Sequence, residues 1–385
     1  MMEQVASNAS VLLSFRAENI RSFRDELEFS MLETSLSDRD VVRQVAWREG
    51  GKPVGVLPVA GIFGSNASGK TNVLRAMSDM RAHVLHSFRH ASPTGGVPNR
   101  PFRLDPATEV APSCFEIELV LEGVRHEYGF RIDKKRVIEE WAYRYPRGRS
   151  ALLFRRDHDE TELGAGERAK GRAVRELLRP NALYLSTAAS ANHPLLLPLY
   201  DWFERNLLLA QANSRSYRQA LTTQLLEDPA RRDQVLALLR AADLGITGAS
   251  LREIDEKMRE RLEQAVQILS GQEADGDGGG ADAQVEFEEF EVRLTHRGAA
   301  GDVELSSIDE SLGTLVWFGL VGPVIEALAD GSVLLADELD ASLHPALVEQ
   351  LIRLFQRPES NPNRAQLLFN SHDVTVLGGS LSRQV

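Results

Sequence analysis

Hydrophobic and polar residues alternate along the first third of the chain, as they do in strands with one buried face. The alternation is clearest over Leu13–Ala17, Phe115–Leu121 and Tyr128–Ile132, and turn residues separate these runs. We therefore expect the first part of a mixed sheet between about Val11 and Tyr145.

The middle of the chain has the periodicity of helices, with apolar residues three or four positions apart. Candidate helices cover Leu199–Leu208, Arg231–Ala242 and Leu251–Leu269. The last one has a coiled-coil-like seam but is too short for a long arm, so an amphipathic helix packed on the domain is the better interpretation. Gly271–Ala283 is glycine-rich, acidic and free of bulky apolar side chains, which predicts a flexible loop.

An apolar run, Val56–Phe63, predicts a buried strand that leads directly into a loop with the Walker A pattern G-x-x-x-x-G-K-[ST]. The loop consists of Gly64, Ser65, Asn66, Ala67, Ser68, Gly69, Lys70 and Thr71. Its glycines allow a tight turn whose N–H groups point at phosphate oxygens, and a helix expected from near Lys70 directs its positive end at the same anion. Lys70 is expected to reach the β- and γ-phosphates of ATP, and the Thr71 hydroxyl is expected to bind Mg²⁺.

A second apolar strand, expected over Ser332–Ala336, ends in two acidic residues, as Walker B strands do. Ligands collect at the carboxyl ends of buried parallel strands. We expect Asp337 to hold Mg²⁺ and Glu338 to orient and deprotonate the attacking water. Many strands end in acids, so the Walker A loop is what makes this interpretation specific.

Two further segments follow this strand. Pro345 suits the first turn of a helix over Ala346–Phe355, but a helix start leaves Asp340 unexplained. Another apolar strand is expected over Gln366–Asn370, and His372 follows its end. The order of the motifs makes His372 a candidate functional residue rather than a surface histidine.

A serine and a glycine, Ser311 and Gly313, precede the Walker B strand at an expected helix start. Such residues at a helix N-terminus form an anion site, although ordinary capping by Ser311 explains them as well. The uncharged stretch Ser311–Ile325 is shorter than the roughly 20 apolar residues of a membrane-spanning helix, so we expect it in the core.

Composition restricts the class of protein. A net charge of -12 argues against a surface that binds nucleic acid everywhere, while a local basic patch stays open. The single cysteine, Cys114, excludes an internal disulfide and a multi-cysteine metal site, in keeping with a reducing cytosol. The N-terminus lacks the basic region of a signal peptide, so we expect a cytoplasmic protein that is not associated with a membrane.

Taken in order, these motifs resemble those of ABC-type AAA family ATPases. Glu338–Pro345 (ELDASLHP) resembles the D-loop of the RecF and OLD lineages, and Phe15–Phe23 (F-x-x-E-N-x-R-S-F) resembles the start of RecF-like proteins. Arg179–Ser186 also resembles family sequence, without an evident chemical role. The resemblance covers nearly the whole chain and is closest in kind to the abortive-infection AbiL/RloA-like group, which includes the ATPase subunit AriA of the PARIS anti-phage system.

The resemblance implies an α/β fold: a P-loop NTPase of the ABC-ATPase head type, with a mixed sheet and a helical insertion between Walker A and Walker B. Residues 11–160 are expected to form the N-terminal part of the head with the P-loop and a β-rich lobe. Residues 161–284 are expected to be a mainly helical insertion that ends in the flexible acidic loop. Residues 285–385 are expected to complete the head with the signature, Walker B, D-loop and switch histidine.

The resemblance also implies roles for the remaining site residues. His372 corresponds to the switch histidine that contacts the γ-phosphate, and Asp340 to the D-loop aspartate. Ser311 and Gly313 correspond to a degenerate signature that caps the nucleotide of a second subunit. Each ATP is then sandwiched between two heads of a homodimer or a higher homo-oligomer. No Q-loop glutamine can be assigned, and the chain ends sooner after His372 than its relatives do, as a truncated chain or a short family member would.

The implied function is a nucleotide-driven dimerisation switch in prokaryotic anti-phage defence, acting with an effector nuclease or toxin. One alternative is a RecF- or SMC-like repair ATPase that binds DNA. Another is an ATP-gated scaffold with little turnover, but the presence of Glu338, the expected base, argues against it. Arg81–His86 fits the loose R-x-x-x-x-H spacing of some RNA-cleaving domains. Because it falls on the helix after the P-loop, we do not expect that activity.

Overall fold

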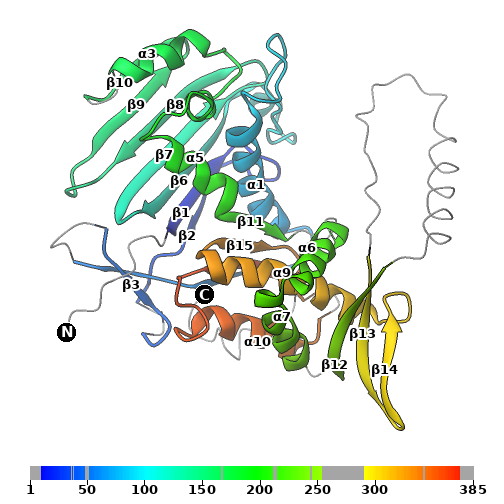
Figure 1. Cartoon of the computed structure of the whole chain (residues 1–385). Coiled ribbons are helices and arrows are strands. Elements are labelled where there is room, and N and C mark those ends of the chain that lie inside the picture. Colours follow the sequence, from blue (N-terminus) through cyan, green and yellow to red (C-terminus); the bar gives the residue numbers. More distant parts are fainter. Residues whose placement is uncertain are drawn as a thin grey trace, which may run out of the picture. The chain divides into compact units, whose positions relative to one another are not determined.

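The structure of the protein is a computed structural model (Figure 1). It describes residues 10–35, 37, 39–47, 52–165, 168–210, 215–242, 245–253, 290–340 and 343–372. The chain forms two compact units: a larger unit of residues 1–213 and 326–385, and a smaller unit of residues 214–325. The three-part division expected from the sequence stays a prediction.

A four-stranded parallel sheet lies in the larger unit (Figure 1). In spatial order it consists of β11 (Leu207–Ala210), β15 (Val333–Ala336), β16 (Gln366–Ser371) and β5 (Val59–Phe63). All residues of β15 and β16 are buried, as expected of parallel strands covered on both faces. Both of these strands were predicted from their apolar runs, and both predictions are confirmed.

The single strand predicted over Val56–Phe63 is wrong, because the run contains two strands. β4 (Val54–Val56) pairs with β3 (Arg43–Val45) in a separate two-stranded sheet, and β5 starts only at Val59. Pro58 lies between them and has no N–H to donate to a strand ladder.

A seven-stranded antiparallel sheet forms the other large part of this unit. Its spatial order is β10 (Glu160–Leu163), β9 (Ala151–Asp157), β8 (Val137–Arg144), β7 (Val124–Ile132), β6 (Ser113–Leu121), β1 (Val11–Glu18) and β2 (Leu27–Ser30). The predicted N-terminal strands lie within β1, β6 and β7 and are confirmed. Gln366 joins this sheet to the parallel one, since its side chain accepts from Leu12 N at 2.7 Å and donates to Leu12 O at 3.0 Å.

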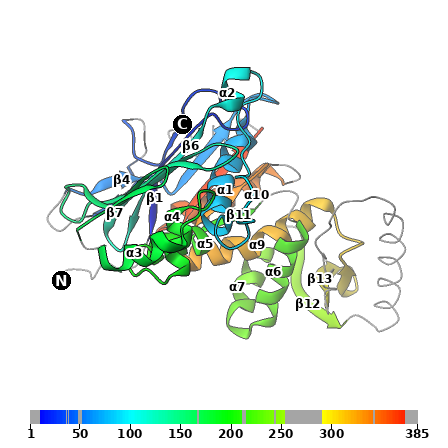
Figure 2. The same ribbon diagram turned by 90° about the horizontal axis from the view of Figure 1, so that it is seen from above.

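Six helices with described residues belong wholly to the larger unit. They are α1 (Lys70–His86), α2 (Pro106–Val110), α3 (Arg168–Leu177), α4 (Tyr184–Ser190), α5 (Leu197–Arg205) and α10 (Pro345–Gln356). Figure 2 shows α1, which packs against α4, α5 and β16. The helix predicted over Ala346–Phe355 is confirmed, whereas Leu199–Leu208 divides at Asn206 into α5 and β11.

Buried charges organise the segment Arg179–Ser186, for which the sequence suggested no role. The carboxylate of Glu140 accepts from Tyr184 N and Leu185 N, at 2.5 and 3.0 Å, and so caps the start of α4. The guanidinium of Arg156 donates to Ala182 O at 2.6 Å and to Arg179 O at 3.2 Å. Burial is the main reason that the pKa of Glu140 rises, to about 6, and the positive charge of Arg156 opposes the rise. This segment therefore has a structural function.

We expect Glu140→Ala to lower the free energy of unfolding by about 3–5 kcal/mol, because it leaves buried N–H groups unpaired and the buried charge of Arg156 without its counter-charge. Urea unfolding followed by tryptophan fluorescence measures this. Glu139→Ala is the control, because the Glu139 carboxylate is partly exposed and makes only a long ion pair, of 3.9 Å, with Arg131. Equal effects of the two substitutions would contradict the role given to Glu140.

The smaller unit combines helices with an antiparallel sheet of three strands. Its elements are α6 (Arg215–Glu227), α7 (Pro229–Ala241), β12 (Ile246–Glu253), β13 (Phe290–Gly298), β14 (Gly301–Ser306) and the first part of α9 (Leu312–Asp330). The helix predicted over Arg231–Ala242 is confirmed as α7. The helix predicted over Leu251–Leu269 is wrong at its start, because Leu251–Glu253 pair with β13. The rest of that helix and the predicted loop Gly271–Ala283 lie outside the described residues.

Helix α9 contains a proline, Pro323, and a neighbouring hydroxyl compensates for the interrupted helical hydrogen bonds. Thr222 Oγ1 accepts from Gly322 N at 2.9 Å and donates to Phe318 O at 2.8 Å, so it stands between two groups of the helix. α9 is long and apolar enough to span a membrane by length and composition alone, and 61% of its most apolar window is buried inside the structure. Core helices of globular proteins share these properties.

Candidate active site

The parallel sheet brings the ends of three motif-bearing strands to one edge. β16 lies between β5 and β15, with Ser371 opposite Phe63 and Phe369 opposite Ala336. Because the strands are parallel, the segments that follow them leave the sheet at the same side. These segments are the Walker A loop, the acidic pair of Walker B and the turn that carries His372.

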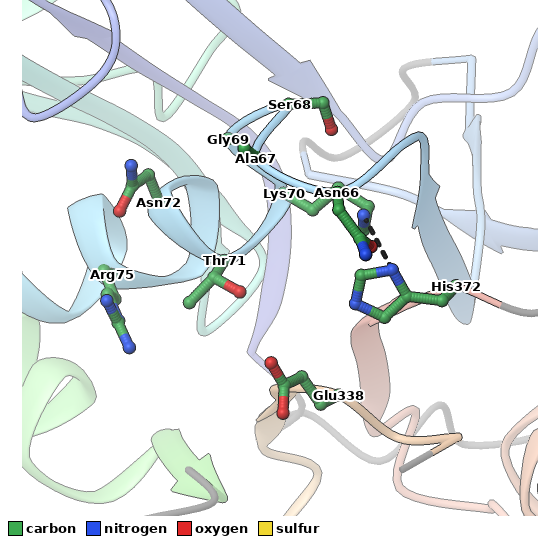
Figure 3. A pocket seen from close by; sticks show the side chains of 10 residues that line it. All are labelled: Asn66, Ala67, Ser68, Gly69, Lys70, Thr71, Asn72, Arg75, Glu338 and His372. Carbon is green, nitrogen blue, oxygen red and sulfur yellow. Dashed lines mark hydrogen bonds between the residues drawn. The ribbon is translucent and has the colours of Figure 1, made fainter.

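A pocket of about 590 Å³ opens at this edge (Figure 3). It is lined by Asn66, Ala67, Ser68, Gly69, Lys70, Thr71, Asn72, Arg75, Glu338 and His372. All of these residues belong to the larger unit. The volume falls within the range of roughly 300–1,000 Å³ typical of small-molecule and cofactor sites.

The Walker A loop has the backbone that its glycines predict. Gly69 has φ 95°, and a Cβ added there would lie 2.9 Å from Ser22 Oγ, so a larger residue would be both strained and crowded. α1 begins at Lys70 without a side-chain cap and without an acidic residue in its first turn. Its first N–H groups and its positive end thus face the pocket without an acidic side chain of the helix's own first turn beside them.

Lys70 is buried and folded back over the loop. Its ammonium group donates to Gly64 O at 2.7 Å and to Ser65 O at 3.0 Å, and it lies 3.2 Å from Nδ1 of His372 (Figure 3). His372 N donates in turn to Oδ2 of Asp340 at 2.8 Å. The predicted switch histidine, D-loop aspartate and P-loop lysine are therefore linked in one chain of contacts.

Asn370, which the sequence pattern identifies only as a strand residue, connects the two halves of the site. Its buried side chain donates to Thr71 Oγ1 at 3.1 Å and to Asp337 Oδ1 at 2.6 Å. Its Oδ1 accepts from Glu338 N. One amide thus holds the two expected Mg²⁺ ligands and the peptide of the expected base. A polar residue near the end of a strand between two motif strands is the only sequence signal for this role.

Glu338 has a backbone conformation that is uncommon for a residue with a side chain. Its φ is 54°, in the left-handed region, and its side chain is exposed at the pocket. Figure 3 shows its carboxylate directed toward the same space as the Thr71 hydroxyl. Strained backbone of this kind is concentrated at functional sites, where the surrounding structure maintains it.

The N-terminal motif N-x-R-S-F (Asn19–Phe23) contacts α1, the helix that follows the Walker A loop. Arg21 forms two hydrogen bonds with Asp79 of α1, at 2.6 and 2.7 Å. Ser22 Oγ accepts from Asn72 Nδ2 at 2.9 Å. The N-x-R-S-F sequence therefore holds the first half of α1 beside the end of β1, a role that the pattern of the strand alone does not indicate.

The remaining candidates have local structural partners. Ser311 Oγ accepts from Thr314 N at 3.1 Å and so caps α9, and Gly313 follows it in the smaller unit. Arg81 donates to Phe203 O at 2.7 Å and to Glu204 O at 3.0 Å, so its guanidinium supports α5. The residues between Asp340 and Leu343 lie outside the described part of the chain.

The donor set fits a nucleotide with Mg²⁺. Thr71 and Asp337 offer two hard oxygen ligands, and Mg²⁺ usually takes one or two protein oxygens beside phosphate and water. Lys70 and the start of α1 offer the positive charge that a triphosphate requires. The carbonyls of the Walker A loop hold Lys70 in place, and the Asn370 amide holds Thr71 and Asp337.

The solved structures to which the chain is similar include heads of SMC proteins. The SMC head domain from Thermotoga maritima is 12% identical over 95% of this chain and 91% of that chain, with a TM-score of 0.36. An Smc head bound to the C-terminal winged-helix domain of ScpA is 11% identical over 95% and 91%, with a TM-score of 0.41. An Smc head from Pyrococcus furiosus bound to the C-terminal domain of ScpA is 12% identical over 96% and 91%, with a TM-score of 0.37.

A family model described as "AAA domain, putative AbiEii toxin, Type IV TA system" matches residues 59–378. No curated protein sequence matches the chain significantly. The family match includes every strand of the parallel sheet and every residue that lines the pocket. Because it spans most of the chain, this protein belongs to that family of AAA domains and has the mixed α/β fold of an ABC-type P-loop ATPase.

Proposed function

We propose that the protein binds ATP with Mg²⁺ in this pocket and hydrolyses it. The observation that carries the proposal is the network through Asn370, which joins Thr71 of Walker A to Asp337 and Glu338 of Walker B. Such a network holds one Mg²⁺-binding residue from each motif in position for a single bound nucleotide. Membership of a P-loop ATPase family supports the same conclusion.

Each side chain then has a defined task. Lys70 binds the β- and γ-phosphates, while Thr71 and Asp337 would hold Mg²⁺, which neutralises charge on the phosphates when it is bound. Glu338 orients the attacking water and accepts its proton. His372, linked to Lys70, contacts the γ-phosphate and reports whether it is present.

The proposed biological role is a nucleotide-driven dimerisation switch. Ser311 and Gly313 of a second copy cap the γ-phosphate, so that ATP closes a head-to-head dimer and hydrolysis releases it. The family description refers to a toxin–antitoxin system and supports a role in prokaryotic defence with an effector nuclease or toxin. ATP-enhanced, salt-dependent DNA binding would instead favour the repair alternative.

Replacing Lys70 with alanine tests the site. We expect Lys70→Ala to weaken ATP binding by roughly 100-fold, because it removes a buried charge from the phosphates. Titration with a fluorescent ATP analogue measures the dissociation constant, and hydrolysis should fall with it. Lys52→Ala, which removes an exposed lysine outside the pocket, is the control. Equal affinity in the wild type and Lys70→Ala would refute the proposed site.

A further inference from the structure

Two histidines face each other near the end of α1 remote from the P-loop. Nδ1 of His86 lies 2.9 Å from Nδ1 of His90, and the ring centroids are 4.9 Å apart. Both side chains are exposed and line a second pocket of the larger unit, of about 340 Å³. Neither residue belongs to the ATP site.

The spacing of the pair is that of a helical metal site. His90 N donates to His86 O at 3.0 Å, so the chain continues for one more helical turn beyond α1. Histidines four positions apart on such a turn share one face, as the two zinc-binding histidines of H-E-x-x-H helices do. Two nitrogens at about 2.1 Å from one ion lie about 3 Å apart at the right angles of a square-planar Cu²⁺ or Ni²⁺ site, close to the separation found here. At the tetrahedral angle of Zn²⁺ they lie about 3.4 Å apart, which a small rotation of the rings supplies.

The surroundings of His86 disfavour a proton on its ring. Burial, then the charges of His90, Arg81 and Arg89, lower the pKa of His86. This shift favours the unprotonated ring, whose free lone pair is the form that binds metals.

The two arginines near His86 and His90 have other interaction partners. Arg81 is held by the carbonyls of α5, and Arg89 lies over the ring of Tyr200, 5.6 Å from its centroid. The negative end of α1 favours a cation at this position. A third histidine of the pocket, His83, packs against Phe115 and Phe130 and is not available as a ligand.

We propose that His86 and His90 together bind a divalent transition-metal ion of the class that prefers imidazole, namely Zn²⁺, Ni²⁺ or Cu²⁺. Within the described residues, no group of three or more histidine, cysteine, aspartate or glutamate side chains is arranged to hold a metal. Among the described residues the site therefore has two protein ligands, and water or an external ligand in the pocket completes the coordination. Apolar residues such as Val97 and Pro98 line the same pocket.

Cu²⁺ provides a direct probe, since its EPR spectrum reports the number of coordinated nitrogens. The full chain, without nucleotide and with one equivalent of Cu²⁺, should show two imidazole nitrogens. His86→Ala and His90→Ala should each reduce this to one at most, and should weaken Zn²⁺ binding measured by calorimetry at least tenfold. His158→Ala removes an exposed histidine that contacts Asp157 and should leave both signals unchanged.

The outcomes separate the proposal from a simple hydrogen bond between the rings. A wild-type spectrum with fewer than two nitrogens would overturn the proposal without the need for any variant. So would Zn²⁺ affinity that is the same in wild type, His86→Ala and His90→Ala. Loss of the signal in His158→Ala alone would assign the metal to a different surface.

Discussion

Glu338→Gln is expected to lower the ATP turnover number by about 10³-fold while ATP affinity stays within about threefold of the wild type. The substitution keeps the size of the side chain and removes the carboxylate that accepts the proton from water. Because Glu338 is exposed at the pocket and its backbone is fixed through Asn370, the amide should occupy the same place.

Steady-state hydrolysis and equilibrium binding of ATP measure the two quantities separately. Size-exclusion chromatography with ATP should also show a longer-lived dimer for Glu338→Gln, since the nucleotide persists between the heads. Glu359→Gln, at an exposed glutamate outside the pocket, is the control. Unchanged turnover in Glu338→Gln would show that another group is the base.

Asn370→Ala is expected to weaken the apparent affinity for Mg²⁺ and the hydrolysis rate by 10–100-fold, as loss of a residue that orients metal ligands does. The alanine removes the donor to Thr71 and Asp337 and the acceptor for Glu338 N. Hydrolysis as a function of Mg²⁺ concentration measures the effect. A high concentration of Mg²⁺ should restore part of the rate.

This restoration distinguishes positioning from general damage to the fold. Asn370→Asp keeps the acceptor for Glu338 N but puts a second carboxylate beside Asp337, so it should alter Mg²⁺ dependence more than thermal stability. If Asn370→Ala unfolds and Mg²⁺ cannot restore its hydrolysis rate, Asn370 stabilises the core and does not position the Mg²⁺ ligands.

The sequence predicts the parallel sheet well because its strands are continuous apolar runs that end in recognisable loops. β15, β16 and the helix from Lys70 follow from this pattern. Short apolar runs are less informative: Leu207–Ala210 reads equally as the end of a helix, and only pairing with β15 makes it a strand.

The interrupted strand before the P-loop shows a different limit. Hydrophobicity continues through Leu57 and Pro58, but proline provides no N–H, and β4 pairs with the preceding short strand β3 rather than with the parallel sheet. The helical spacing from Leu251 likewise coincides with a strand whose partner is more than thirty residues away. Neither partner is visible in the local pattern.

At the candidate site, the motifs predict the residues that would touch ATP but not the residues that hold them. Asn370 and Arg21 act through contacts with segments up to about 300 positions distant, and no spacing rule links them to their partners. Glu140 is similar, because its burial against the start of α4 arises only from the fold.

The most direct test is a structure of the protein with Mg²⁺ and a non-hydrolysable ATP analogue. We predict that the ammonium group of Lys70 contacts the β- and γ-phosphates, and that Thr71 and Asp337 approach one Mg²⁺ bound to the same triphosphate. An analogue bound in another pocket, or a triphosphate that Lys70 contacts while Asp337 stays remote from its metal, would contradict the account.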